Sequence, residues 1–170
     1  YHYTLPDGEA AFGYSENQAT YLNWYPFFPT YENNEGWLIN PIHDVGERFV
    51  YPLSDYEVTI YFDETVFQVA GPSIGERDKG FVQFSLTNAR TFSWTIAKGF
   101  FMEFRDGDVP ISVFLPTEYS ELSPDIFLII EQSLKAFQHW FGEYPYHAIT
   151  LTSIDYDDGM ESDGIAFIGE

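Results

Sequence analysis

The chain has 170 residues, which is enough for one substantial core or for one domain and part of another. Its 27 acidic residues against 7 basic ones give a net charge of −20, which argues against nucleic-acid and anionic-membrane partners because phosphate binding requires clustered Lys and Arg. Apolar residues make up 45%, too many for a disordered chain, and without cysteine there is neither a disulfide framework nor a thiol nucleophile.

The N-terminal part predicts little regular structure. The first 20 residues are polar and rich in turn-forming residues, which indicates loop or short strands. Residues 21–31 are densely aromatic, and Pro26 and Pro29 exclude regular sheet pairing inside this segment. Because large aromatic side chains dominate burial energetics, we interpret the cluster as core that covers one end of a sheet. The alternative is an exposed platform, including Trp24 and Tyr25, on which a sugar stacks.

Between Arg48 and Leu115, apolar and polar residues alternate in several short runs. This period of two is typical of strands that bury one face. Turn-forming residues separate the runs, for example Asp-Lys-Gly at 78–80 and Asp-Gly-Asp at 106–108. Strands of this length and spacing favour an antiparallel β-sandwich. The predicted strands cover residues 56–62, 82–86, 92–96, 100–104 and 111–115.

A single amphipathic helix is predicted over residues 124–141. Ser123 is the expected N-cap, Pro124 suits the first helical position, and Asp125 interacts favourably with the positive end of the helix dipole. Apolar side chains recur every three or four residues, which predicts one stripe packed on a sheet. The stripe consists of Ile126, Ile130, Leu134, Phe137 and Phe141, and Phe127 and Trp140 widen it.

The residues after the helix predict a strand and then an acidic edge. Gly142 can take the left-handed conformation that ends a helix. Residues 148–152 alternate as a half-buried strand does. Further on, Gly159 lets the backbone lie close to a ligand, and Glu161 offers a carboxylate beside it. A backbone edge next to a carboxylate suits the binding of a peptide with a free amino end.

These C-terminal motifs also carry a resemblance to a known family. Four motifs follow one another along the chain. They are Phe-Gly-x-Tyr-Pro-Tyr at 141–146, the strand after it, Gly-Met-Glu at 159–161 and Gly-Ile-Ala-Phe-Ile at 164–168. Together they resemble the zinc aminopeptidases of the aminopeptidase N type, which are gluzincins. Asp158 stands where that family usually has a small residue, and Ser162 stands where it has Asn or an aromatic residue.

The resemblance extends upstream and implies a fold. Asn-Trp-Tyr-Pro at 23–26 and Gly-Trp at 36–37 are similar to segments of the β-domain that precedes the family's catalytic domain. Residues 1–116 are therefore expected to be part of an N-terminal antiparallel β-sandwich. Residues 117–170 are expected to be the helix and first strands of a thermolysin-like α+β catalytic domain. The expected class is mainly β, and the chain is expected to be a fragment of a longer peptidase.

The resemblance also implies the roles of the site residues. In the family, the Gly-Met-Glu strand lines the substrate cleft, and its glutamate holds the α-ammonium group of the substrate. Here these substrate-binding residues are Gly159, Met160 and Glu161, and the partner is a peptide with a free amino terminus. Zinc in the intact parent would polarise the scissile carbonyl and activate water. Its ligands are expected after Glu170, so the chain alone is expected to be inactive.

From the residues alone, no metal site is predicted. A catalytic zinc site of this class needs two His four residues apart with Glu following the first, and none of the four histidines has this spacing. They are His2, His43, His139 and His147. A looser calcium or magnesium site and a solvated loop both remain open for the acidic run, although it fails the EF-hand spacing. That run contains Asp155, Asp157, Asp158, Glu161 and Asp163.

The alternative function belongs to a different class. An acidic β-sandwich without catalytic residues would be a binding module for carbohydrate or for a basic protein. The aromatic cluster around Trp24 and Tyr25 would be its binding surface. The net charge of −20 suits cationic partners through long-range attraction.

Overall fold

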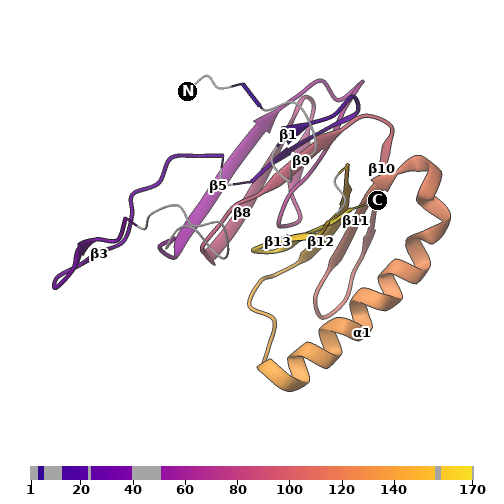
Figure 1. Ribbon diagram of the computed structural model, residues 1–170. Coiled ribbons are helices and arrows are strands. Elements are labelled where there is room, and N and C mark those ends of the chain that lie inside the picture. Colours follow the sequence, from indigo (N-terminus) through magenta and orange to yellow (C-terminus); the bar gives the residue numbers. More distant parts are fainter. Residues whose placement is uncertain (1–3, 6–12, 23, 40–50, 156–157, 170) are drawn as a thin grey trace.

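The computed structural model describes residues 4–5, 13–22, 24–39, 51–155 and 158–169 (Figure 1). Over these residues the chain is mainly β, with antiparallel sheets, one mixed sheet and one α-helix. The mainly β class predicted from the sequence is confirmed. In this described part, no helix has the length and apolar character that crossing a membrane requires.

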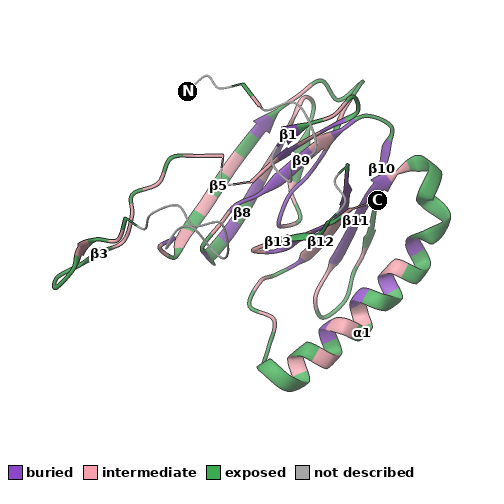
Figure 2. Ribbon diagram, viewed as in Figure 1, coloured by how far each residue is buried: buried purple, intermediate pink, exposed green. Residues whose placement is uncertain are grey.

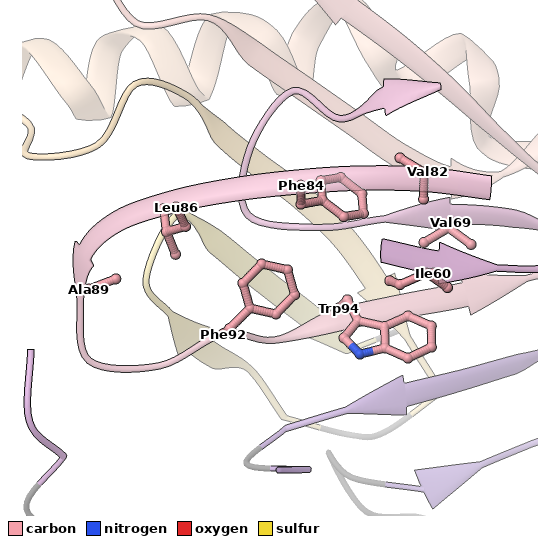
Figure 3. Packing of buried hydrophobic residues seen from close by; sticks show 8 residues of the cluster. All are labelled: Ile60, Val69, Val82, Phe84, Leu86, Ala89, Phe92 and Trp94. Carbon is pink, nitrogen blue, oxygen red and sulfur yellow. The ribbon is translucent and has the colours of Figure 1, made fainter. Parts of the chain in front are cut away.

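Two antiparallel sheets form a sandwich around one core. The first has the order β5 (Ser54–Tyr61), β8 (Phe81–Ala89) and β7 (Glu76–Asp78). The second has the order β1 (Gly13–Tyr14), β2 (Gln18–Tyr21), β9 (Trp94–Ala97) and β6 (Gln68–Ala70). Buried side chains from both sheets meet in the cluster of Figure 3, which contains Ile60, Val69, Val82, Phe84, Leu86, Ala89, Phe92 and Trp94. A hairpin of β3 (Tyr31–Glu32) and β4 (Gly36–Trp37) projects away from the sandwich (Figure 1).

A mixed five-stranded sheet follows the sandwich. Its order is β10 (Phe100–Arg105), β11 (Ile111–Pro116), β12 (Ile149–Ile154), β14 (Ile165–Gly169) and β13 (Met160–Ser162). The three central strands are parallel, and each outer strand is antiparallel to its neighbour. A short 3₁₀ helix (Thr117–Leu122) and α1 (Ser123–Phe141) connect β11 to β12, because two parallel neighbours need a crossover connection.

The mixed sheet is covered on both faces. On one face, Ile111, Val113 and Leu115 of β11 pack against buried residues of α1. On the other face, Phe114 packs with Ala70 and Ala97 of the four-stranded sheet. The order of layers is therefore three-stranded sheet, four-stranded sheet, mixed sheet and helix, as Figure 1 shows.

The predicted boundary near Pro116 cuts through the mixed sheet. Strands β10 and β11 lie before this residue, yet they pair with β12, β14 and β13, which lie after it. The alternation of apolar residues predicts both strands correctly. The alternation does not show which sheet a strand joins, because apolar residues alternate with the same period of two in either sheet.

The helix ends where the sequence predicts, begins one residue earlier than predicted, and has a different cap. Pro124 lies in the first turn, and Gly142 follows the last residue with a φ of 96°. The prediction that Ser123 is the N-cap is wrong: Leu122 occupies that position without a side-chain cap bond. The Ser123 hydroxyl is instead buried and donates a hydrogen bond of 2.5 Å to Oε2 of Glu103 on β10.

The predicted apolar stripe is only partly buried. Phe127, Ile130 and Leu134 are buried, whereas Phe137 and Phe141 are exposed (Figure 2). A 19-residue helix is about 28 Å long, and a six-residue strand such as β11 spans about 20 Å. The last two turns of the helix therefore extend past the sheet, and Trp140 is 67% exposed at this end.

Candidate functional site

The Gly-Met-Glu segment lies at an edge of the mixed sheet. Strand β13 is the outermost strand of this sheet and pairs with β14, with Glu161 opposite Ala166. Gly159 directly precedes the strand and is exposed, as is Glu161. No other strand among the described residues pairs with the outer side of β13, so the backbone N–H and C=O groups that point to this side are available to a ligand. The arrangement predicted from sequence, a backbone edge beside a carboxylate, is present.

A cavity of about 710 Å³ lies next to Glu161. Met160 and Glu161 of β13 form one wall, and the segment 90–93 between β8 and β9 forms another. Tyr144 and Tyr146, from the loop between α1 and β12, also line the cavity. The cavity thus lies where the sandwich meets the mixed sheet, and its walls come from segments far apart in the sequence.

Asp163, in the turn between β13 and β14, fixes this edge to the sandwich. Its Oδ2 accepts hydrogen bonds from the backbone N–H groups of Arg90 and Thr91 at 2.5 and 2.7 Å, and from the Thr91 hydroxyl at 3.2 Å. Its Oδ1 accepts one from the Tyr146 hydroxyl at 2.5 Å. The half-buried carboxylate therefore has four donors and connects three segments of the chain.

Hydrogen bonds of Ser162 and a close approach at Gly164 support the same turn. The Ser162 hydroxyl lies 2.8 Å from that of Thr91 and donates to that of Ser93 at 2.9 Å. Gly164 has a φ of 75°, and a Cβ there would lie 2.3 Å from the carbonyl oxygen of Pro72. Only glycine fits at this position, and the turn therefore contacts two segments of the sandwich, one at residues 91–93 and one at Pro72.

The surroundings of two tyrosines in the cavity wall raise the pKa values of their hydroxyl groups. Burial raises the pKa of Tyr144 above its usual range, and the Asp163 charge adds to the effect. Burial also raises the pKa of Tyr146, as do its hydrogen bond to Asp163 and the charge of that carboxylate. Both hydroxyls therefore stay protonated and neutral, and that of Tyr146 donates its hydrogen bond to Asp163.

These pKa shifts predict a loss of stability in alkali. The unfolded chain releases the tyrosine protons near the usual pKa of 10.0, whereas the folded chain holds them to higher pH. Above about pH 10 unfolding therefore releases protons, and the free energy of unfolding falls as the pH rises. Urea unfolding at about pH 8 and about pH 11 measures this loss, which we expect to be smaller in Tyr144→Phe. If the unchanged chain and Tyr144→Phe lose the same unfolding free energy between these pH values, the pH dependence does not come from Tyr144.

The residues that the structure describes do not fit a zinc site. Among them, no group of three His, Cys, Asp or Glu side chains is placed to hold a metal ion. His139 on α1 and His147 before β12 are both exposed. His2, His43 and Asp157 lie outside the described residues. Of the acidic run, Asp155, Asp158 and Glu161 are exposed, and Asp163 is occupied by the hydrogen bonds above.

The aromatic cluster packs mainly against the sandwich. Trp24 is half-buried, its Nε1 donates to the Phe92 carbonyl at 3.0 Å, and its ring meets Trp94 edge-on at 6.1 Å. The Tyr25 hydroxyl donates to that of Tyr56 at 2.8 Å. These contacts favour the interpretation of Trp24 and Tyr25 as core over that of a sugar platform, although Phe28 in the same segment is 85% exposed.

Several residues of the cavity were not predicted from the sequence. Arg90 and Thr91 lie between two strands and belong to no motif, and Thr91 is 72 residues from Asp163 in the chain. Tyr146 belongs to the run at 141–146, which carries the family resemblance but predicts no role for this side chain. Comparison with models of protein families gives no match, and comparison with curated proteins gives none either.

Proposed function

We propose that the chain is a segment of a zinc aminopeptidase resembling aminopeptidase N, and that its edge strand β13 binds the amino end of a peptide. The observation that carries the proposal is the position of Glu161, an exposed carboxylate on an unpaired strand edge beside a cavity of about 710 Å³. The order of the C-terminal motifs in the sequence supports it.

Peptide binding at this edge requires only simple chemistry. An extended peptide hydrogen-bonds along the free edge of β13 as an added strand would. Glu161 accepts hydrogen bonds from the α-ammonium group at the end of the peptide, and such charge-assisted bonds are stronger than neutral ones. Met160, which lines the cavity, offers apolar surface next to this contact, and the exposed Gly159 before it allows close backbone approach. The first side chain of the peptide enters the cavity.

Hydrolysis is assigned to the intact parent and not to this segment. Zinc would there polarise the scissile carbonyl and lower the pKa of a bound water. The residues described here do not fit a zinc site, so no hydrolytic step is assigned to them. The purified chain is expected to show no turnover of an aminoacyl reporter, with or without zinc. Zinc-dependent turnover by this chain would contradict that division of roles.

Binding to the amino terminus is tested with a pair of peptides. We expect a pentapeptide with the sequence Ala-Ala-Gly-Ala-Gly and a C-terminal fluorophore to bind, and its N-acetylated form to bind about tenfold more weakly, equivalent to about 1.4 kcal/mol. Glu161→Gln is expected to remove this difference, because the amide carries no charge for the ammonium group. Fluorescence anisotropy titrations give the dissociation constants.

A matched control removes the same charge elsewhere. Glu118→Gln alters an exposed residue of the 3₁₀ helix that does not line the cavity, so it should keep the preference for the free amino terminus. The proposed function is wrong if both peptides bind the unchanged chain equally, or if the two substitutions have the same effect.

A further inference from the structure

Arg90 brings a positive charge to the cavity that holds Glu161. It is one of 7 basic residues in the chain and the one basic residue among the described residues that line this cavity. Its Nη1 donates to the carbonyl oxygen of Tyr51 at 2.9 Å. That bond holds the guanidinium at the cavity wall and leaves four of its five N–H donors for other acceptors.

The carboxylates nearby do not neutralise this arginine. Asp163 accepts from the backbone N–H of Arg90, and its oxygens are further occupied by Thr91 and Tyr146. Across the described residues, the ion pair that forms is Arg105–Glu131, and Arg90 takes part in none. Within this described part, Arg77, Lys79, Lys98 and Lys135 also form no ion pair, and Arg90 differs from them because it lines this cavity. Because Arg90 lines the cavity, a ligand bound there can supply an anion for its remaining donors.

The two charges of the cavity match the two charges of an acidic residue at a free amino end. Such a residue has an α-ammonium group and, on a short side chain, a carboxylate. Glu161 can accept from the first, and the planar guanidinium of Arg90 can donate two parallel bonds to the second. The half-buried tyrosines Tyr144 and Tyr146 also line this cavity.

We propose that this cavity selects peptides whose first residue is glutamate or aspartate, with Arg90 binding the side-chain carboxylate and Glu161 the α-ammonium group. The proposal rests on the proposed function and adds the substrate class. It runs against the overall charge of the chain, which by long-range attraction favours a basic first residue. Local complementarity and net charge therefore predict opposite orders of affinity.

Peptides that differ only in their first residue test the proposal. Glu-Ala-Gly-Ala-Gly, its Gln and Lys counterparts and the acetylated Glu peptide each carry the same C-terminal fluorophore, and anisotropy gives their dissociation constants. We expect the Glu peptide to bind about tenfold more tightly than the Gln peptide, which has the same shape without the charge. The Lys peptide should bind more weakly than the Gln peptide.

Variants then assign the preference to one side chain. Arg90→Gln is expected to make the Glu and Gln peptides bind equally, and Arg90→Lys to keep part of the preference. Lys98→Gln is the matched control, because it removes the same charge from the β9–β10 turn outside the cavity. Thermal unfolding shows whether each variant is folded. If a variant does not fold, the comparison of the Glu and Gln peptides on the unchanged chain still tests the acidic preference.

The outcomes separate this proposal from the one it rests on. Equal binding of the Glu and Gln peptides, with acetylation still weakening the binding, overturns the acidic preference and leaves the proposed function in place. No binding of any peptide, or no effect of acetylation, overturns both. A Glu preference that persists in Arg90→Gln overturns the role of Arg90.

Discussion

Replacing Phe127 by alanine is expected to lower the free energy of unfolding by about 3–5 kcal/mol. Phe127 is 0% exposed and belongs to the buried cluster between α1 and the mixed sheet. The guanidinium of Arg105 lies over its ring, with Cζ 4.2 Å from the ring centroid. The substitution removes buried apolar surface, leaves a cavity and loses this cation–π contact. Urea unfolding followed by circular dichroism measures the difference.

A second aromatic residue on the same helix is the control. Trp140 is larger than Phe127 but 67% exposed, so Trp140→Ala is expected to change the free energy of unfolding by less than about 1 kcal/mol. Both substitutions leave alanine, a good helix former, so propensity contributes little to the contrast. Similar losses in the two variants would contradict the burial pattern of α1.

This contrast also shows what the helical pattern predicts and what it does not. Periodicity gives the direction in which a side chain points, and it places Ile130 and Leu134 on the buried face correctly. It gives no information on where the sheet ends along the helix axis. Phe137 continues the same stripe and is 55% exposed, because no described strand lies beneath it. The extent of contact depends on the length of the strands across from the helix.

The strands show a similar division between local and long-range information. Alternation and turn residues predict the existence of β5, β8, β10 and β11 from short windows of sequence. Pairing depends on partners far away in the chain. Strand β11 pairs with β12 only after a crossover through α1, so its place in the mixed sheet is not encoded in its own residues.

In the candidate site, the edge position of Glu161 is predictable from its own neighbourhood. Gly159 and the carboxylate two residues after it are the local signals that predict an acidic edge. The cavity beside it is not local, since Arg90 and Thr91 come from the sandwich. The acidic run makes Asp163 a candidate ligand for a cation, but its four donors give it a structural role instead. Sequence spacing does not show which carboxylates are already satisfied.

Replacing Asp163 by alanine is expected to lower the free energy of unfolding by about 2–4 kcal/mol. The substitution removes an acceptor from the backbone N–H groups of Arg90 and Thr91 and from the Tyr146 hydroxyl. Hydrogen bonds to a charged group contribute more than neutral ones, and donors left unpaired in a partly buried site add to the cost. Asp163→Asn keeps one acceptor oxygen and should lose less. Asp108→Ala, in the exposed turn between β10 and β11, should have almost no effect.

The same substitution is expected to weaken peptide binding without removing any group that contacts the peptide. Glu161 lies two residues before Asp163 in one hairpin, and Asp163 joins this hairpin to the segment 90–93. Once this connection is lost, binding must also order the edge, which costs conformational entropy. We therefore expect Asp163→Ala to raise the dissociation constant of the free-amino pentapeptide, even at a temperature where the variant is fully folded. Unchanged stability together with unchanged binding would show that the hairpin is held by its other contacts, Ser162 and the close approach of Gly164 to Pro72.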